Sequence, residues 1–96
     1  MKTYYVYILT NVGKNVLYIG VTNDLTRRLR EHRTNHDSIN AFTYKYNCYY
    51  LVYYEEFNNI DQAVEREKQL KGLKRFKKED LINKFNPGWI FLNNDV

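Results

Sequence analysis

A chain of 96 residues, 44% of them hydrophobic and 17% aromatic, predicts one folded domain over residues 1–96 and excludes an intrinsically disordered protein. No apolar run approaches the roughly 20 residues that cross a bilayer, and the N-terminus has no signal-peptide cleavage site, so we expect no membrane partner. Cys48 is the only cysteine, which excludes an intramolecular disulfide and a thiolate metal cluster and favours a reducing, cytoplasmic setting.

The formal net charge of +4 is mild, but the 15 basic residues are unevenly distributed along the chain. One cluster within residues 27–33 contains Arg27, Arg28, Arg30 and Arg33. A second cluster within residues 71–78 contains Lys71, Lys74, Arg75, Lys77 and Lys78. Two such clusters indicate a polyanionic partner, with nucleic acid the leading candidate, while two solvated helix faces are the alternative explanation.

Residues 3–10 are β-branched and aromatic throughout, which predicts a strand that is apolar on both faces and therefore covered on both. Alternation places Tyr5, Tyr7 and Leu9 on one face, and the opposite face carries Tyr4, Val6 and Ile8. Residues 11–15 contain Asn and Gly, as a hairpin loop does, and residues 16–21 read as the returning strand. We expect the two strands to pair antiparallel.

A basic helix follows, with Thr22 or Asn23 as its cap and Asp24 in its first turn. Its apolar seam is Leu25 and Leu29, and it fades near residues 35–38. Residues 34–47 are polar and predict a loop, and residues 48–57 predict a third strand.

A second helix begins near Asn59 or Asp61 and ends near Gly72, with an apolar stripe of Ile60, Ala63, Val64 and Leu70. A third helix covers residues 77–85, stops at residues 86–88, and is followed by an apolar tail that packs back, made of Trp89, Ile90 and Phe91. The order favours the α+β class, with a small three-stranded antiparallel sheet flanked by three helices.

Glu67 stands out because a carboxylate on the apolar stripe of the second helix is unfavourable unless it is paired or binds a metal. An ion pair with Lys71, one turn further along the helix, is the structural explanation; a metal ligand is the functional one.

Arg28 and His32 lie four residues apart, so they share one face of the first helix. Arg28 follows the buried seam closely enough to reach over the sheet, where a planar guanidinium suits a bidentate phosphate contact. A solvated basic face is the alternative. His32 and His36 share the same spacing, but a two-histidine metal site lacks an evident third ligand.

Tyr7 and Tyr18 lie on the paired strands, and on an exposed face of the sheet their hydroxyls would be able to hold a water or a phosphate. Gly20 shares a face with Tyr18, and a glycine in a strand lets a ligand or backbone approach closely. Simple packing of tyrosine rings is the alternative.

Taken together, these features resemble the GIY-YIG nuclease domain, specifically its small stand-alone bacterial members. The triplet YVY at residues 5–7 and YIG at 18–20 match the two signature triplets, with Tyr5 in place of the first glycine. Arg27, Arg28 and His32 follow the family spacing, the segment around Glu67 resembles the one with the single acidic metal ligand, and NPGW at 86–89 resembles the closing segment.

The resemblance implies a DNA endonuclease that hydrolyses phosphodiester bonds, in DNA repair or recombination, with one divalent cation, Mg²⁺ or Mn²⁺. Glu67 would ligate the cation and Arg28 would bind the phosphate. Tyr7 is the favoured general base, with Tyr18 in support. The nearby metal, Arg28 or His32 would lower its pKa or take the proton. Asn86 matches the last polar residue of the family or caps the third helix.

Flanking DNA backbone would contact Arg27, Arg30, Lys71, Lys74, Arg75, Lys77 and Lys78, with little sequence preference and with targeting guided by DNA structure. Two other functions remain open. One is a nucleic-acid-binding module without useful turnover. The other is a docking domain of a larger DNA-processing complex, which an exposed patch of Trp89, Ile90 and Phe91 would favour.

Overall fold

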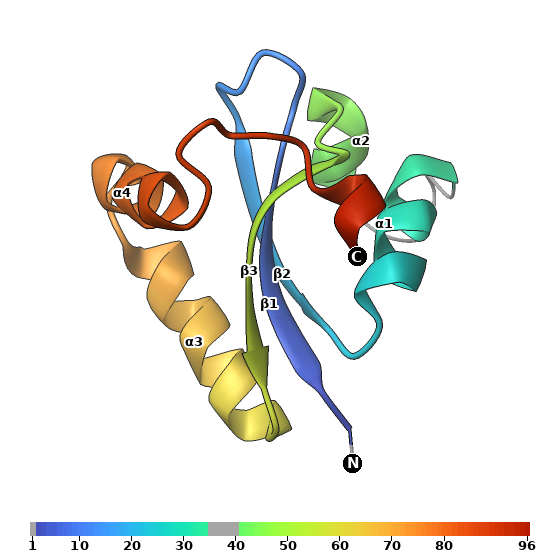
Figure 1. The fold of residues 1–96 in the computed structure, drawn as a ribbon, viewed down its shortest axis with the longest axis vertical. Helices are drawn as coiled ribbons and strands as arrows, with labels where there is room; N and C mark the ends of the chain where they lie inside the picture. Colours follow the sequence, from blue (N-terminus) through green and yellow to red (C-terminus); the bar gives the residue numbers. More distant parts are fainter. Residues whose placement is uncertain (1, 35–40) are drawn as a thin grey trace.

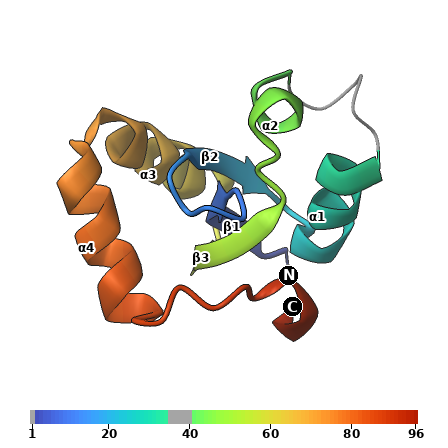
Figure 2. The same cartoon turned by 90° about the horizontal axis from the view of Figure 1, so that it is seen from above.

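The structure is a computed structural model and describes residues 2–34 and 41–96. Its elements, in chain order, are β1 (Tyr4–Thr10), β2 (Leu17–Thr22), α1 (Leu25–Thr34), α2 (Ala41–Tyr46), β3 (Tyr50–Phe57), α3 (Ile60–Gly72), α4 (Arg75–Phe85) and the short 3₁₀ helix η1 (Asn93–Asp95). The strands form one antiparallel sheet in the order β2-β1-β3, with α1 and α2 on one face and α3 and α4 on the other (Figures 1 and 2). The predicted α+β class is confirmed.

The central strand β1 separates two apolar clusters, as its alternation predicts. Val6 and Ile8 face α3 and α4, where they pack with Leu70 and Ile82. On the opposite face the buried apolar residues are Tyr7, Leu9, Leu25, Leu29, Cys48 and Leu51. Both faces of the sheet are therefore covered, and Cys48 is a buried free cysteine, as expected.

The start of α1 differs from the prediction, because neither Thr22 nor Asn23 is its cap. Leu25 is the first helical residue, and the Asp24 carboxylate accepts a hydrogen bond from the Arg27 backbone N–H at 3.0 Å. The Thr22 hydroxyl instead accepts the Asp24 N–H at 3.1 Å. Asp24 therefore caps the helix and Thr22 holds the capping residue in place.

The predicted loop over residues 34–47 is wrong for Ala41–Tyr46, which form α2. The expected fading of α1 near residues 35–38 lies outside the described residues. Asn47 ends α2 with a left-handed φ of 56°, and the Cys48 N–H donates to the Thr43 carbonyl at 3.0 Å. Asparagine favours this type of helix-terminating hydrogen bond. Strand β3 therefore begins at Tyr50, later in the sequence than predicted.

Helix α4 begins at Arg75, two residues before the predicted start. The Lys74 carbonyl accepts the N–H groups of Lys77 and Lys78 at 3.0 and 3.2 Å, which completes the first turn. Lys74 makes no side-chain capping bond, so the sequence carries no signal at this boundary. The Arg75 guanidinium donates to the Asn15 carbonyl at 2.9 Å and so ties α4 to the β1–β2 loop.

The C-terminal segment crosses the edge of β3, from the side of α4 to the side of α1 (Figure 2). The Leu92 N–H donates to the Leu51 carbonyl at 2.8 Å, and the Leu51 N–H donates to the Asn93 side chain at 2.8 Å. Trp89 and Phe91 pack on the core as predicted, while Ile90 is 65% exposed. The three residues therefore do not form an exposed apolar patch.

Asn86 fixes this segment to the sheet. Its Nδ2 donates to the carbonyls of Val52 at 3.1 Å and Ile90 at 2.8 Å, and its Oδ1 accepts the Ile90 N–H at 3.0 Å. Ile8 pairs with Tyr53 and Leu9 with Leu51, so Val52 is the extra residue of a β-bulge, where a carbonyl is left for a partner outside the ladder. Among the described residues, no helix is long and apolar enough to span a bilayer.

We predict that Asn86→Ala lowers the free energy of unfolding by about 3 kcal/mol, because it removes three hydrogen bonds and leaves the buried Val52 carbonyl without its Asn86 donor. Urea unfolding followed by circular dichroism measures this. Asn94→Ala, an exposed change in the same segment, is expected to alter the value by less than about 0.5 kcal/mol. Equal effects of the two changes would contradict the role of Asn86 as a clamp.

Candidate functional site

Three rings from three different elements converge under α1: Tyr7 of β1, Tyr18 of β2 and His32 of α1. Their centroids lie 6.4 Å apart for Tyr7 and Tyr18, 6.0 Å for Tyr7 and His32, and 5.6 Å for Tyr18 and His32. The Tyr7 hydroxyl is hydrogen-bonded to His32 Nε2 at 3.0 Å. The structure thus brings together three residues that the sequence selected separately.

The face of the sheet that carries these tyrosines is covered, as the apolar alternation of residues 3–10 predicts. Tyr7 is 0% exposed because α1 covers it, whereas Tyr18 is half-buried. Burial raises the pKa of Tyr7 well above its usual value, the nearby Tyr18 hydroxyl adds to the increase, and Arg28 opposes it. Tyr7 is therefore a neutral phenol at neutral pH, and Tyr18 is the tyrosine with access to solvent.

Gly20 lies directly beside Tyr7 in the sheet, and the two are paired in the β1–β2 register. A Cβ built on Gly20 would lie 2.5 Å from the Tyr7 hydroxyl oxygen and 2.6 Å from Cζ. The close approach that the sequence predicted at this glycine is thus made by the side chain of Tyr7, not by a ligand. The missing side chain lets the Tyr7 ring lie across β2 and reach His32.

His32 is buried, 2% exposed, and uses both ring nitrogens. Nε2 faces Tyr7, and Nδ1 is hydrogen-bonded to the Thr43 hydroxyl at 3.2 Å. Burial, followed by the charge of Arg28, lowers the pKa of His32 to about 4, with Glu31 acting in the opposite direction. The imidazole is therefore neutral at neutral pH.

A metal site built on His32 and His36 gains no support. His36 lies outside the described residues, and both nitrogens of His32 already have hydroxyl partners. Within residues 2–34 and 41–96, no three histidine, cysteine or carboxylate side chains form a group able to hold a metal ion.

Arg28 lies beside the three rings. Its guanidinium lowers the pKa of Tyr7 both through its charge and as a hydrogen-bond donor to the hydroxyl. Its Nε is buried and has no hydrogen-bond acceptor among the described residues; the nearest carboxylate oxygen, from Glu31, is 3.4 Å away. A buried guanidinium N–H without an acceptor is unusual, and it leaves a donor for an additional oxygen atom.

Glu67 reaches the same region from the other face of the sheet. On α3, the neighbouring Arg66 donates to the Glu55 carboxylate of β3 through Nε and Nη2, each at 3.0 Å, which fixes the rotation of the helix. Glu67 follows Arg66 and so lies about 100° further around the helix, and its charge raises the pKa of Tyr7. Its side chain is 17% exposed, and Lys71 Nζ lies 3.2 Å away, so the expected ion pair is present.

The basic residues do not form one continuous surface. Lys71 and Lys78 line a groove of about 310 Å³ beside β2, together with Leu17, Tyr18 and Ile19, and this groove adjoins the ring cluster. Arg30 lies on the other flank of α1, in a hollow with Arg33 and Asn93.

The remaining members of the two clusters differ in their contacts. Lys74 and Lys77 are exposed. Arg27 pairs with Glu31 at 3.7 Å, and Arg75 pairs with Glu79 at 2.9 Å in addition to its bond with the β1–β2 loop. Arg75 therefore has a structural role in the free chain.

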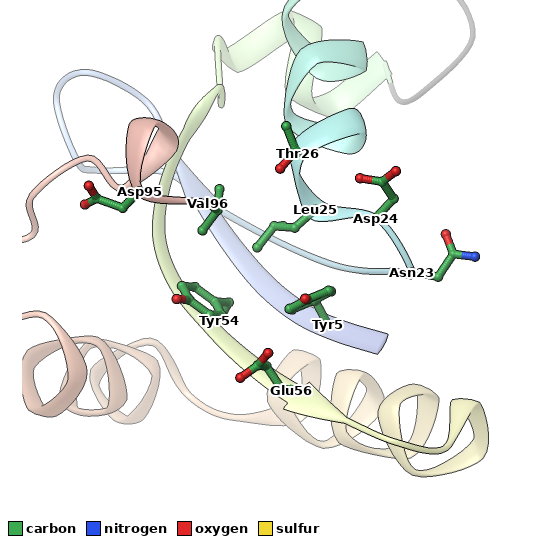
Figure 3. A pocket seen from close by; sticks show the side chains of 9 residues that line it. All are labelled: Tyr5, Asn23, Asp24, Leu25, Thr26, Tyr54, Glu56, Asp95 and Val96. Atoms are coloured by element: carbon green, nitrogen blue, oxygen red, sulfur yellow. The ribbon is translucent and has the colours of Figure 1, made fainter. Parts of the chain in front are cut away.

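Figure 3 shows a separate pocket of about 280 Å³ at the start of α1, between that helix, β3 and the C-terminal segment. Asp24, Glu56 and Asp95 contribute three carboxylates to its lining, and Tyr5 and Tyr54 contribute two rings. The pocket contains none of the predicted site residues, and its carboxylates disfavour a polyanion. Asn86 is also separate from the ring cluster, because its bonds hold the C-terminal segment.

Thr43 is the member of this cluster that sequence reasoning missed. It belongs to α2, which was predicted as loop, and a single threonine in a polar segment carries no functional signal. The asparagine at position 47 was the available signal, because asparagine commonly ends a helix in the left-handed conformation.

The site therefore combines a buried arginine donor without a hydrogen bond, a half-buried carboxylate and hydroxyl-bearing rings beside a basic groove, which are groups that proteins use to hold a phosphate. The chain belongs to the GIY-YIG family: the model of the GIY-YIG catalytic domain matches residues 3–80. GIY-YIG domains are nuclease domains that typically use a divalent metal ion and act on DNA.

Three similar proteins lie within this family. The UPF0213 protein of Natronomonas pharaonis is 34% identical over 79 residues, covering 82% of this chain and 89% of its own. The UPF0213 protein of Oceanobacillus iheyensis is 35% identical over 81 residues, covering 84% and 91%. The solution NMR structure of the UPF0213 protein BH0048 from Bacillus halodurans is 26% identical, with a TM-score of 0.55 over 98% of this chain and 94% of that one. The expected family of small GIY-YIG proteins is confirmed.

We predict that Gly20→Ala destabilises the fold by about 2 kcal/mol, because the added methyl group displaces the Tyr7 ring. It also breaks the bond between Tyr7 and His32, which a change in the His32 ring resonances would report. Gly72→Ala is the matched control: nothing lies within 4 Å of its Cβ, and alanine at a helical position stabilises by up to about 1 kcal/mol. Effects of the same sign and size at both positions would contradict the tight contact.

A second prediction concerns acid stability. Because the folded state holds the pKa of His32 at about 4, below 6.5 in the unfolded chain, the protonated imidazole favours unfolding. This contribution is complete above pH 6.5 and is lost as the pH falls toward 4, by about 3 kcal/mol in total. Urea unfolding at intervals between pH 7.5 and 4.5 should show a steeper loss in the wild type than in His32→Gln. Parallel curves would contradict the buried neutral histidine.

Proposed function

We propose that this chain is a DNA endonuclease that hydrolyses phosphodiester bonds with the aid of one divalent cation, Mg²⁺ or Mn²⁺, in cytoplasmic DNA repair or recombination. The observation that carries the proposal is the buried Nε of Arg28, which makes no hydrogen bond in the described part of the chain and belongs to a guanidinium whose charge lowers the pKa of Tyr7. A non-bridging phosphate oxygen would supply that acceptor and place the phosphorus next to the tyrosine hydroxyls.

Arg28 suits this role because Glu31 pairs with its guanidinium while part of the side chain remains accessible to a phosphate. Its side chain is 30% exposed, and Glu31, at 3.4 Å, limits its movement. A guanidinium in such a position stabilises the charge that develops on the non-bridging oxygens in the transition state.

Glu67 fits a hard divalent cation. Mg²⁺ is commonly bound by one or two carboxylates, with water and substrate phosphate oxygens completing its shell, so a single carboxylate beside the phosphate is sufficient. When bound, the cation would neutralise charge near the leaving oxygen. In the free chain, Lys71 Nζ lies 3.2 Å from the Glu67 carboxylate. Because Lys71 is exposed, it is able to turn toward the DNA backbone when the cation binds.

The two tyrosines act on the attacking water in sequence. The sequence favoured Tyr7 as the general base, with Tyr18 in support. Because Tyr7 is completely buried, we infer instead that the attacking water first contacts Tyr18. Half-buried Tyr18 orients the water. The water gives a proton to the Tyr7 oxygen as the Tyr7 hydroxyl proton moves to the neutral Nε2 of His32, to which that hydroxyl is already bonded at 3.0 Å.

DNA would enter along the groove beside β2. Lys71 and Lys78 line this groove next to Tyr18, which places two cations beside the proposed scissile phosphate. Further along the backbone lie the exposed side chains of Arg27, Lys74 and Lys77. These contacts are to phosphates, so they support binding with little sequence preference and strong salt dependence. The Asn86 clamp would serve the site only indirectly, by holding the C-terminal segment.

We predict that Arg28→Ala and Glu67→Ala each lower the rate of DNA cleavage roughly 100-fold or more. The assay uses branched, nicked, single-stranded and linear DNA with Mg²⁺ or Mn²⁺. Glu65→Ala is the matched control, since Glu65 lies on the same helix and is exposed; its rate should equal that of the wild type.

The same assay separates nuclease activity from mere binding. We expect Glu67→Ala to retain DNA binding, because the substitution removes a negative charge that repels DNA when no cation is bound. If the wild type and both variants bind DNA equally and none cleaves any substrate with either metal, the ion pair of Glu67 with Lys71 is purely structural and the chain is a nucleic-acid-binding module.

A further inference from the structure

The second hydrogen bond of His32 has no part in the proposed chemistry so far. Its partner, Thr43, is 2% exposed and sits behind the imidazole, on the side away from Tyr7. The position of Thr43 is fixed independently of His32, because its carbonyl accepts the N–H of buried Cys48 at 3.0 Å and Asn47 closes the helix with its left-handed φ of 56°. The structure thus holds one threonine hydroxyl rigidly against Nδ1.

The hydroxyls on the two sides of His32 are each able to donate or accept, so two arrangements of the protons are conceivable. A neutral imidazole carries a single N–H. Either Nδ1–H donates to Thr43 and Nε2 accepts from Tyr7, or Thr43 donates to Nδ1 and Nε2–H donates to Tyr7.

The proposed proton transfer selects between them. For Tyr7 to pass its proton to His32, Nε2, which lies 3.0 Å from the Tyr7 oxygen, must present its lone pair. The ring proton then lies on Nδ1, where the Thr43 oxygen at 3.2 Å is its acceptor.

We propose that Thr43 is a positioning residue of the site: its hydroxyl oxygen holds His32 in the Nδ1–H tautomer, so that Nε2 accepts the proton of Tyr7. This inference rests on the proposed nuclease activity, because the direction of proton transfer selects the tautomer; NMR of the histidine rings tests the tautomer independently of cleavage. The role is the one that a hydrogen-bond acceptor commonly has behind a functional histidine, where it fixes both the ring orientation and the protonated nitrogen.

Replacing Thr43 with valine keeps the shape of the side chain and removes the acceptor. A buried Nδ1–H would lose this partner, so the proton is expected to move to Nε2. There it points toward the Tyr7 oxygen and blocks proton transfer from Tyr7. Thr43→Ser retains the hydroxyl and should behave like the wild type.

Long-range proton–nitrogen NMR correlation of the histidine rings measures the tautomer directly. The chain has two histidines, and the His32→Gln variant identifies the signals of His32. We expect Nδ1 to be the protonated nitrogen in the wild type and in Thr43→Ser, and Nε2 to carry the proton partly or wholly in Thr43→Val. A wild-type ring protonated on Nε2, or a Thr43→Val ring that keeps Nδ1–H, would overturn the proposal.

Cleavage kinetics test the functional part. Thr43→Val should lower kcat on the order of tenfold or more with little change in KM, and Thr43→Ser should restore it. An unchanged kcat in Thr43→Val, in a chain whose tautomer has changed, would overturn the positioning role.

The two measurements distinguish the possible failures. If the wild type cleaves no DNA, the nuclease proposal fails while the NMR result still decides the tautomer. If Thr43→Val does not fold, the wild-type tautomer alone decides, since protonation on Nε2 contradicts the assigned hydrogen bonds.

Discussion

The site depends on one buried hydrogen bond, between the Tyr7 hydroxyl and His32 Nε2 at 3.0 Å. This bond requires the Tyr7 ring to lie across its neighbour in the sheet, and only a residue without Cβ at position 20 permits that. It also requires α1 to pass over the sheet at a fixed height, which Leu25 and Leu29 set by packing on the same face as Tyr7. Gly20, Tyr7 and His32 are therefore one structural unit contributed by three elements.

The edge strand β2 allows residues from both faces of the sheet to influence the same hydroxyl. Arg28 lies on α1, on one face, Glu67 lies on α3, on the other, and the charges of both shift the pKa of Tyr7. Among the described residues, β2 has no further strand beyond it, and the groove that Lys71 and Lys78 line lies beside it.

Much of this was predictable from sequence because the signals are local. The double-sided apolar alternation of β1, the hairpin glycine and the position of Glu67 on an apolar stripe each follow from spacing within one element. The sequence predicted a covered strand, but the contact of the Tyr7 hydroxyl with His32 was not predictable, because it depends on how closely α1 approaches the sheet. Nor was the occupant of the space at Gly20, which depends on the β1–β2 register, or the role of Thr43, whose contact with His32 joins residues of two separate helices.

The central claim is that the Tyr7–His32 pair acts on the attacking water, opposite the leaving group. The most direct test compares wild type and Tyr7→Phe on DNA and on a phosphodiester of p-nitrophenol, whose leaving group needs no stabilisation at neutral pH. The account predicts that Tyr7→Phe loses a similar factor in kcat/KM on both substrates, because attack is impaired in each. Full activity of Tyr7→Phe on the p-nitrophenyl ester, with loss on DNA alone, would place Tyr7 on the leaving-group side and contradict the account.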